Sequence, residues 1–210
     1  NDTYPIWFIQ QIENIRPDIT TINLSLINTP WYIKQHRDGQ LGTPAPISMS
    51  DSYIDQINIR RWETSQFSFP VPRNLMSAQQ AELGKPAVSS SEMDTLKFVL
   101  EPQMQVNSQE GPVGILRVQD QMIIHMILAN RWQRPIYYAA TVAGNNMLGE
   151  LREYLRLDGM VYKLTPYKNP QFDPTQMENL LTKTYQYRGL NDTTSYLDEM
   201  TISLLQNYRS

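Results

Sequence analysis

The chain has 210 residues, of which 40% are apolar and 19% charged, a balance that is typical of a globular protein and excludes a wholly disordered one. The formal net charge is −3 and no Lys/Arg-rich run occurs, so no nucleic-acid partner is expected. The absence of cysteine excludes disulfides and thiolate metal sites. Only His36 and His125 are histidines, so we expect neither a metal site nor another cofactor.

Helices and a short strand alternate at the start of the chain. Pro5, which a first helical turn tolerates, lies near the start of a predicted helix over 4–14. The next segment, 19–27, is short and rich in β-branched residues, which predicts a strand. Pro30 then begins a second predicted helix, over 31–37. This order is typical of a wound α/β fold, so we predict a mostly parallel sheet with flanking helices.

The middle of the chain, 39–114, is punctuated by prolines and gives weaker signals. Short extended pieces are predicted at 45–49, 54–59 and 96–100, and a long surface loop at 71–91. We interpret the region as an irregular, Pro-rich insertion.

Regular patterns return in the second half. Apolar residues recur at helical spacing over 116–130, which predicts a buried helix. Residues 136–142 predict a central strand, and the Asp-Gly pair within 154–164 predicts a hairpin. The C-terminal end is expected to be helical, over 173–187 and 194–207.

These elements predict one soluble α/β domain. The longest apolar stretch, from Met122 to Ala129, is far shorter than the roughly 20 residues that a membrane span needs. The expected organisation is one domain over 1–210, with a sheet core at 1–38 and 115–165, the irregular insertion at 39–114 and C-terminal helices at 173–210.

Polar residues lie at the predicted helix starts and strand ends, where α/β folds usually bind ligands. They can orient a sugar or a phosphate; the alternative is that the Asn, Asp and Thr side chains only cap helices. Arg134 can contact a phosphate or lie in a solvated joint. The candidate substrate-binding residues are Asn1, Asp2, Thr3, Asn28, Thr29, Arg134, Asn145 and Asn146.

No catalytic residue is assigned. The sequence has no Gly-rich phosphate loop and no Gly-x-Ser-x-Gly elbow. His125 lies on an apolar face, which favours a hydrogen-bonded core histidine, and His36 is interpreted as part of a solvated helix end. Glu150, Glu153 and Asp158 are close in sequence, but they do not establish an acid–base pair.

The tryptophans have two interpretations. Exposed rings could form a sugar-stacking surface, because aromatic faces suit the apolar faces of pyranose rings. Core packing is favoured for Trp7 and Trp31.

Several segments resemble, in the same order, a family of bacterial multi-pass membrane proteins that was long of unknown function and is common in Bacteroidetes. The opening Asn1–Trp7 is similar to the family's Asn-Asp-Thr-Phe-Pro-Leu-Trp segment, although the Gly-Asp that precedes it in the family is missing here. The family is related to an animal protein O-mannosyltransferase. The other matching segments are Arg16–Asp18, Asn23–Ile33, Leu116–Asp120, Arg134–Ala139, Asn146–Gly149, Tyr154–Gly159 and Gly189–Asp192.

The resemblance implies a preceding block of transmembrane helices of the GT-C glycosyltransferase type. It implies a parent protein in the bacterial inner membrane, with this domain on the periplasmic side. The parent would transfer mannose or a related sugar from a polyprenyl-phosphate carrier to protein Ser/Thr. The catalytic carboxylate of such enzymes lies in an early loop between membrane helices, so this domain is expected to bind the acceptor or to give structural support.

The partners implied are the chain's own transmembrane domain and an acceptor protein or sugar-lipid. Whether this chain is itself an enzyme stays open. Two alternatives remain: a soluble sugar- or nucleotide-sugar-binding α/β enzyme, and a purely structural interaction domain.

Overall fold

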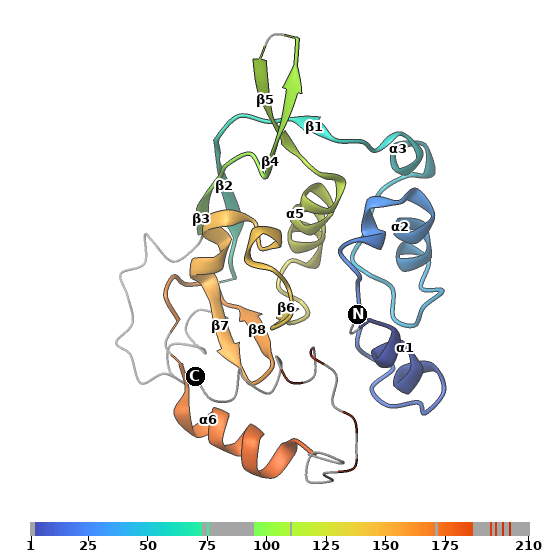
Figure 1. Ribbon diagram of the computed structural model, residues 1–210, viewed down its shortest axis with the longest axis vertical. Helices are drawn as coiled ribbons and strands as arrows, with labels where there is room; N and C mark the ends of the chain where they lie inside the picture. Colours follow the sequence, from blue (N-terminus) through green and yellow to red (C-terminus); the bar gives the residue numbers. More distant parts are fainter. Residues whose placement is uncertain are drawn as a thin grey trace. The chain divides into compact units, whose positions relative to one another are not determined.

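The computed structural model describes residues 3–72, 75, 95–109, 111–170, 172–186, 194, 196, 199 and 202 (Figure 1). The chain divides into two compact units. The first is formed by Asn1–Arg134 with Leu148–Glu150, and the second by Pro135–Met147 with Leu151–Ser210.

All strand pairs among the described residues are antiparallel, and they form three small sheets with the orders β1-β5-β4, β2-β3 and β6-β8-β7. The predicted wound, mostly parallel α/β sheet is therefore wrong. The strands are β1 Arg60–Arg61, β2 Ser65–Pro70, β3 Thr95–Leu100, β4 Met104–Ser108, β5 Gly111–Leu116, β6 Tyr137–Ala139, β7 Leu155–Asp158 and β8 Val161–Leu164.

The helices are short, apart from α5. The α-helices are α1 Thr3–Gln11, α2 Pro30–Arg37, α3 Asp51–Gln56, α5 Val118–Asn130 and α6 Pro174–Asn179. Three short segments are 3₁₀-helices, which wind more tightly than an α-helix: η1 Leu26–Asn28, η2 Gly144–Asn146 and η3 Gly149–Tyr154. The segment η4 Leu180–Thr184 is a π-helix, which winds more widely. No helix in the described part of the chain is long and apolar enough to cross a bilayer.

The predicted strand over 19–27 does not form, which removes the first strand of the expected sheet. Its backbone is bound by side chains instead of by a neighbouring strand. Gln10 donates to the Ile19 carbonyl at 2.9 Å, and the Asn23 carboxamide accepts the Ser25 and Leu26 N–H groups at 2.9 and 3.1 Å. An Asn side chain that bonds the following backbone favours a turn, and η1 begins at that point.

Several other predicted elements are present in the structure. The helices expected at 4–14, 31–37 and 116–130 correspond to α1, α2 and α5, and the hairpin at 154–164 is formed by β7 and β8. The segment 54–59, expected to be extended, lies partly in α3, whose start is capped by Ser50. The strand expected at 136–142 is the three-residue edge strand β6 rather than a central strand.

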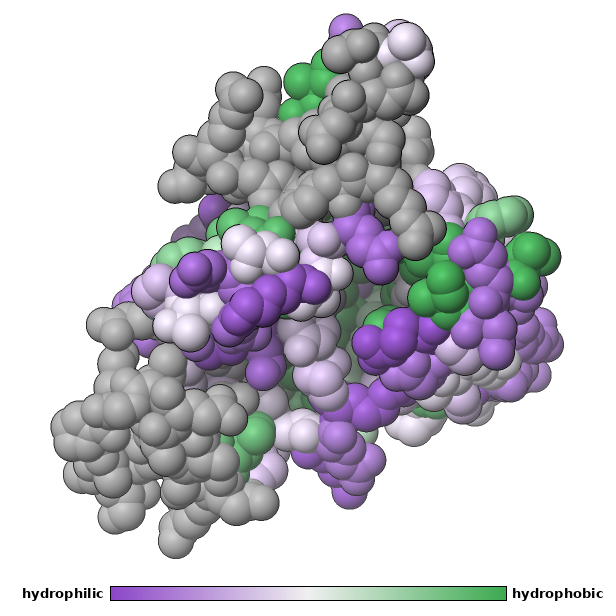
Figure 2. Space-filling model, turned by 90° about the horizontal axis from the view of Figure 1, so that it is seen from below, coloured by the Kyte–Doolittle hydropathy of each residue, from purple (hydrophilic) through white to green (hydrophobic). Residues whose placement is uncertain are grey.

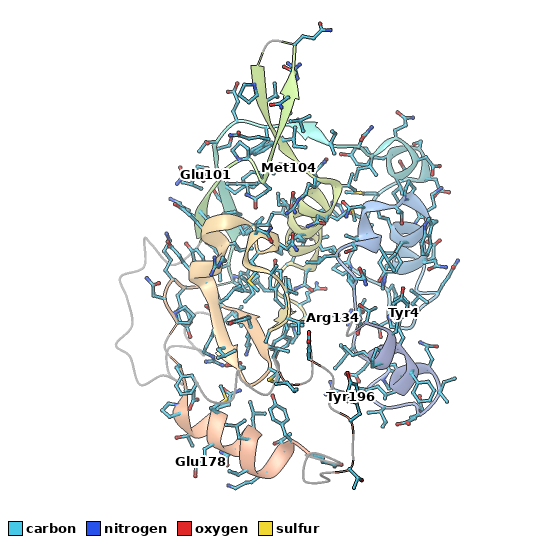
Figure 3. The ribbon with its side chains drawn as sticks, viewed as in Figure 1. Tyr4, Glu101, Met104, Arg134, Glu178 and Tyr196 are labelled. Atoms are coloured by element: carbon cyan, nitrogen blue, oxygen red, sulfur yellow. The ribbon has the colours of Figure 1, made fainter. Side chains whose placement is uncertain are left out.

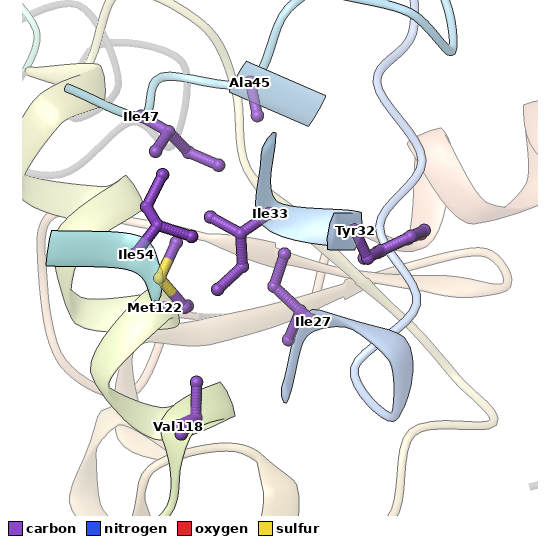
Figure 4. Packing of buried hydrophobic residues seen from close by; sticks show 8 residues of the cluster. All are labelled: Ile27, Tyr32, Ile33, Ala45, Ile47, Ile54, Val118 and Met122. Atoms are coloured by element: carbon purple, nitrogen blue, oxygen red, sulfur yellow. The ribbon is translucent and has the colours of Figure 1, made fainter. Parts of the chain in front are cut away.

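A hydrophobic core of the first unit forms where η1, α2, α3 and α5 meet (Figure 4). Ile33 of α2, Ile54 of α3 and Met122 of α5 are fully buried there. Burying one such side chain stabilises a protein by about 1.5–3 kcal/mol. The core therefore holds these helices together. Its other members are Ile27, Tyr32, Ala45, Ile47 and Val118.

The two-stranded sheet of β2 and β3 carries an aromatic cluster. Phe67 lies directly opposite Phe98, with ring centroids 5.9 Å apart, and Phe69 contacts Phe98 at 5.5 Å. The Glu150 carboxylate accepts the Val99 N–H at 2.7 Å. A side chain thus satisfies a β3 backbone group.

In the second unit, β8 lies between β6 and β7. Gly159 has a φ of +68° in the turn between β7 and β8, a conformation that glycine adopts without strain. Arg156 donates to both carboxylate oxygens of Asp158, at 2.7 and 3.0 Å. Asp173 begins α6 by accepting the Gln176 N–H at 2.9 Å.

Candidate functional site

Thr3 lies in the first turn of α1, and its hydroxyl accepts a hydrogen bond from the Asn23 carboxamide at 3.0 Å. The Asn23 N–H in turn donates to the Tyr32 hydroxyl at 2.9 Å. Thr3 therefore joins α1 to the turn before η1 and, through Asn23, to α2. Asn1 and Asp2 lie outside the described residues.

Asn28 joins η1 to the start of α5. Its carboxamide oxygen accepts the Gln119 N–H at 2.9 Å, and its nitrogen donates to the Gln119 side-chain oxygen at 3.0 Å. Thr29 precedes α2, but its hydroxyl donates back to the Leu26 carbonyl at 2.7 Å and makes no cap bond. Both residues thus hold helix ends within the first unit.

Arg134, which is labelled in Figure 3, binds three oxygens from the N-terminal third of the chain. Its guanidinium donates to the carbonyls of Pro44 and Asp18, at 3.3 and 3.2 Å, and to the Thr20 hydroxyl at 3.1 Å. These bonds occupy guanidinium N–H groups that could otherwise donate to a phosphate. The contacts show how the side chain is held in this structure.

Asn145 and Asn146 form part of η2 in the second unit, whereas the other described candidates, Thr3, Asn28, Thr29 and Arg134, belong to the first unit. Their role in substrate binding stays a prediction.

The two histidines differ from each other in burial. His36 is only 2% exposed, and its Nε2 atom has no hydrogen-bond partner among the described residues. The predicted solvated helix end is therefore wrong, and burial lowers the pKa of His36 to about 4. His125 accepts the Ser48 N–H at 3.1 Å, as expected for a hydrogen-bonded structural histidine, and partial burial lowers its pKa.

The three carboxylates near the hairpin have separate partners. Glu150 accepts from the Val99 backbone, Glu153 pairs with Lys168 at 2.7 Å, and Asp158 pairs with Arg156. Within the described ranges, no group of three metal-binding side chains gathers.

An apolar surface of α1 is the feature that the sequence analysis missed. Tyr4 and Phe8 of α1, and Ile12 directly after its last residue, follow one another at helical spacing and are 61%, 55% and 71% exposed. We call these three residues the α1 face. The helix contains no charged residue. In the view from below, green apolar side chains are exposed between purple polar ones at the right edge (Figure 2).

Aromatic contacts connect the α1 face to α2. The Tyr4 ring lies 5.7 Å from Trp7, Trp7 lies 6.2 Å from Tyr32, and Tyr32 lies 5.5 Å from Trp31. Trp31 is 53% exposed, so its predicted place in the core is wrong. The spacing of Tyr4, Phe8 and Ile12 was a usable sequence signal.

The family comparison matches residues 1–64 and 63–184 to the family described as TMEM260-associated domain 2. The chain belongs to this family. Membership in the TMEM260-associated domain 2 family links the chain to a glycosyltransferase-related protein, and this link is the part of the resemblance that the match supports. No curated protein sequence and no solved structure matches the chain.

Proposed function

We propose that this chain is a non-catalytic domain of a membrane glycosyltransferase. The parent protein transfers mannose or a related sugar from a polyprenyl-phosphate carrier to protein Ser/Thr, and the chemistry takes place in its membrane-embedded part. The parent lies in the bacterial inner membrane, and this domain faces the periplasm. The TMEM260-associated domain 2 match supports the link to glycosylation.

The observation that carries the proposal is the exposed α1 face. Isolated exposed apolar residues are ordinary, but large side chains grouped on an uncharged helix and on the residue that follows it mark a contact surface. Tyr and Trp are enriched where a protein meets both an apolar and an aqueous phase, and Tyr4 has this character. We assign the α1 face to contact with the parent's own membrane-embedded part.

The candidate polar residues of the first unit form hydrogen bonds within that unit, which favours a structural role for them over a catalytic one. Thr3, Asn28 and Arg134 each hold one segment of the first unit to another. The antiparallel sheets also remove the basis for a soluble sugar-nucleotide enzyme, since that alternative relied on a ligand crevice at the ends of parallel strands.

The test uses the full-length parent in membranes. The double substitution Phe8→Ser, Ile12→Ser should lower the transfer of labelled mannose from polyprenyl-phosphate mannose to a Ser/Thr peptide, because it makes the docking surface polar. The stability of the isolated chain should change little, since both side chains are exposed.

Tyr53→Ser is the matched control, because Tyr53 is an exposed aromatic residue of another helix, α3. It should leave the transfer rate unchanged. Normal transfer by the α1 variant would contradict the assigned contact. Efficient transfer by the isolated chain would contradict the non-catalytic role.

A further inference from the structure

Among the described residues, strand β4 has an open edge. In the sheet order β1-β5-β4, β5 lies on one side of β4, and no strand of the described residues lies on the other. The hairpin of β4 and β5 projects from the rest of the first unit (Figure 1). Met104 and Val106 of β4 are 53% and 39% exposed. An exposed strand edge is a template for pairing with another extended chain.

The strand register shows which backbone groups face this edge. Asn107 lies opposite Pro112, which has no N–H, so these two residues cannot exchange both ladder hydrogen bonds. Gln105 lies opposite Gly114, whose carbonyl accepts the Trp62 N–H on the β1 side. Both observations place the N–H and C=O groups of Gln105 and Asn107 on the side away from β5.

The edge also lacks the usual protection against pairing. Natural edge strands carry charged residues or proline, whereas Met104–Ser108 contains neither, and no charge lies in β5. Elsewhere in this unit, side chains bind strand backbone groups: Glu150 accepts the Val99 N–H of β3, and the Trp132 indole donates to the Pro70 carbonyl of β2 at 2.8 Å.

We propose that the open edge of β4 binds an extended, uncharged polypeptide segment as an additional strand. The outward-facing N–H and C=O groups of Gln105 and Asn107 are two residues apart. An extended chain presents its own backbone groups at the same spacing, so it can bond to both residues. No charged side chain of β4 or β5 would compensate a charge on such a segment, so an uncharged segment is favoured. The identification of this segment with the Ser/Thr acceptor rests on the proposed function.

The test uses the whole chain and a capped peptide of Ser, Thr and Val. The peptide should slow the amide hydrogen exchange of Gln105 and Asn107. The substitution Asn107→Pro removes an outward N–H but no β4–β5 bond, and should weaken peptide binding about tenfold or more. Asn107→Ala is the matched control, since it keeps the N–H and should bind as the original chain does.

A second arm leaves the protein unchanged. The same peptide with every backbone nitrogen methylated has no N–H group to donate to a strand ladder and should not bind. Equal binding by the Asn107→Pro chain or by the methylated peptide would overturn the proposal, as would unchanged exchange with the normal peptide. Protection that depends on protein concentration without peptide would show that a second copy occupies the edge, and would also overturn the proposal.

The outcome is separable from that of the transfer assay. Loss of transfer in the α1 variant with no peptide binding would refute only the strand edge. Peptide binding by a chain whose parent transfers no sugar would refute the proposed function and leave the edge as a peptide site.

Discussion

Arg156 and Asp158 form a buried ion pair within β7, with 8% and 7% of their side chains exposed. The hydrogen bond to Asp158 raises the pKa of the Arg156 guanidinium, which stays charged. The nearby Gln176 side chain accepts a further bond at 3.2 Å. A buried charge that loses its partner is costly, so the loss of either residue should strongly destabilise the second unit.

We therefore expect Asp158→Ala to lower the free energy of unfolding by about 3–5 kcal/mol, because it leaves a buried guanidinium without its carboxylate. Urea denaturation measures the change. Asp18→Ala is the matched control, since Asp18 and Arg16 form an exposed pair, and it should cost less than about 1 kcal/mol. Equal effects of the two substitutions would contradict the burial argument.

His36 predicts a pH dependence of stability. Burial lowers its pKa from 6.5 to about 4, so the unfolded chain binds its proton more readily than the folded chain. Stability is fully retained above about pH 6.5 and falls as the pH drops toward about 4. The loss is on the order of 3 kcal/mol.

Substitution of the imidazole isolates this effect. His36→Phe should flatten the pH dependence of the free energy of unfolding over that range, although it can shift the absolute stability because His36 packs against Tyr32 at 4.5 Å. Chemical denaturation at several pH values gives the comparison. A profile with an unchanged slope would show that His36 does not titrate in this way.

At the scale of elements, Gly114 decides how β5 packs. A Cβ at this position would lie 2.5 Å from Pro102 Cγ and 2.8 Å from the Trp62 carbonyl oxygen. Both distances are too short for a Cβ atom, and the second neighbour is a backbone atom that cannot rotate away. The absence of a side chain therefore lets β1 and the segment before β4 approach β5.

Gly114→Ala should destabilise the chain by about 1–3 kcal/mol through this overpacking. Gly144→Ala is the control, because its new Cβ would lie 3.1 Å from the end of the flexible Arg152 side chain. Thermal unfolding compares the two. A larger effect at Gly144 would be inconsistent with the packing described.

Some elements could be predicted because their signals are local. Pro30 at the first helical position and Gly39, with a φ of +72° after the helix, define α2 without reference to the rest of the chain. The turn at Asp158-Gly159 defines the hairpin in the same way. The segment 19–27 has strand composition but no partner strand, and composition alone does not supply one.

At the scale of the whole molecule, the error in fold class has one origin. A helix–strand–helix order predicts a parallel sheet only if the strands find one another, and 19–27 forms no strand. The region 39–114, expected to be irregular, contains α3 and β1–β4. Its strands pair with partners that local sequence does not reveal, such as Arg61 with Ile115.

The candidate site shows the same division. The chemistry of Thr3, Asn28 and Arg134 predicts contacts with a ligand, and the structure shows that their polar atoms bind neighbouring segments. The α1 face was readable from the spacing of its residues. The open edge of β4 was not, since an edge exists only once the order of the strands is known.

The sequence by itself determined the family, the ends of α2, the extent of α5 and the β7–β8 hairpin, because motifs, caps and turns depend on neighbouring residues. Only the tertiary structure decided the antiparallel sheets, the burial of His36 and the exposure of Trp31. Strand pairing and burial depend on contacts between residues far apart in the chain, and no local pattern encodes which of those contacts form.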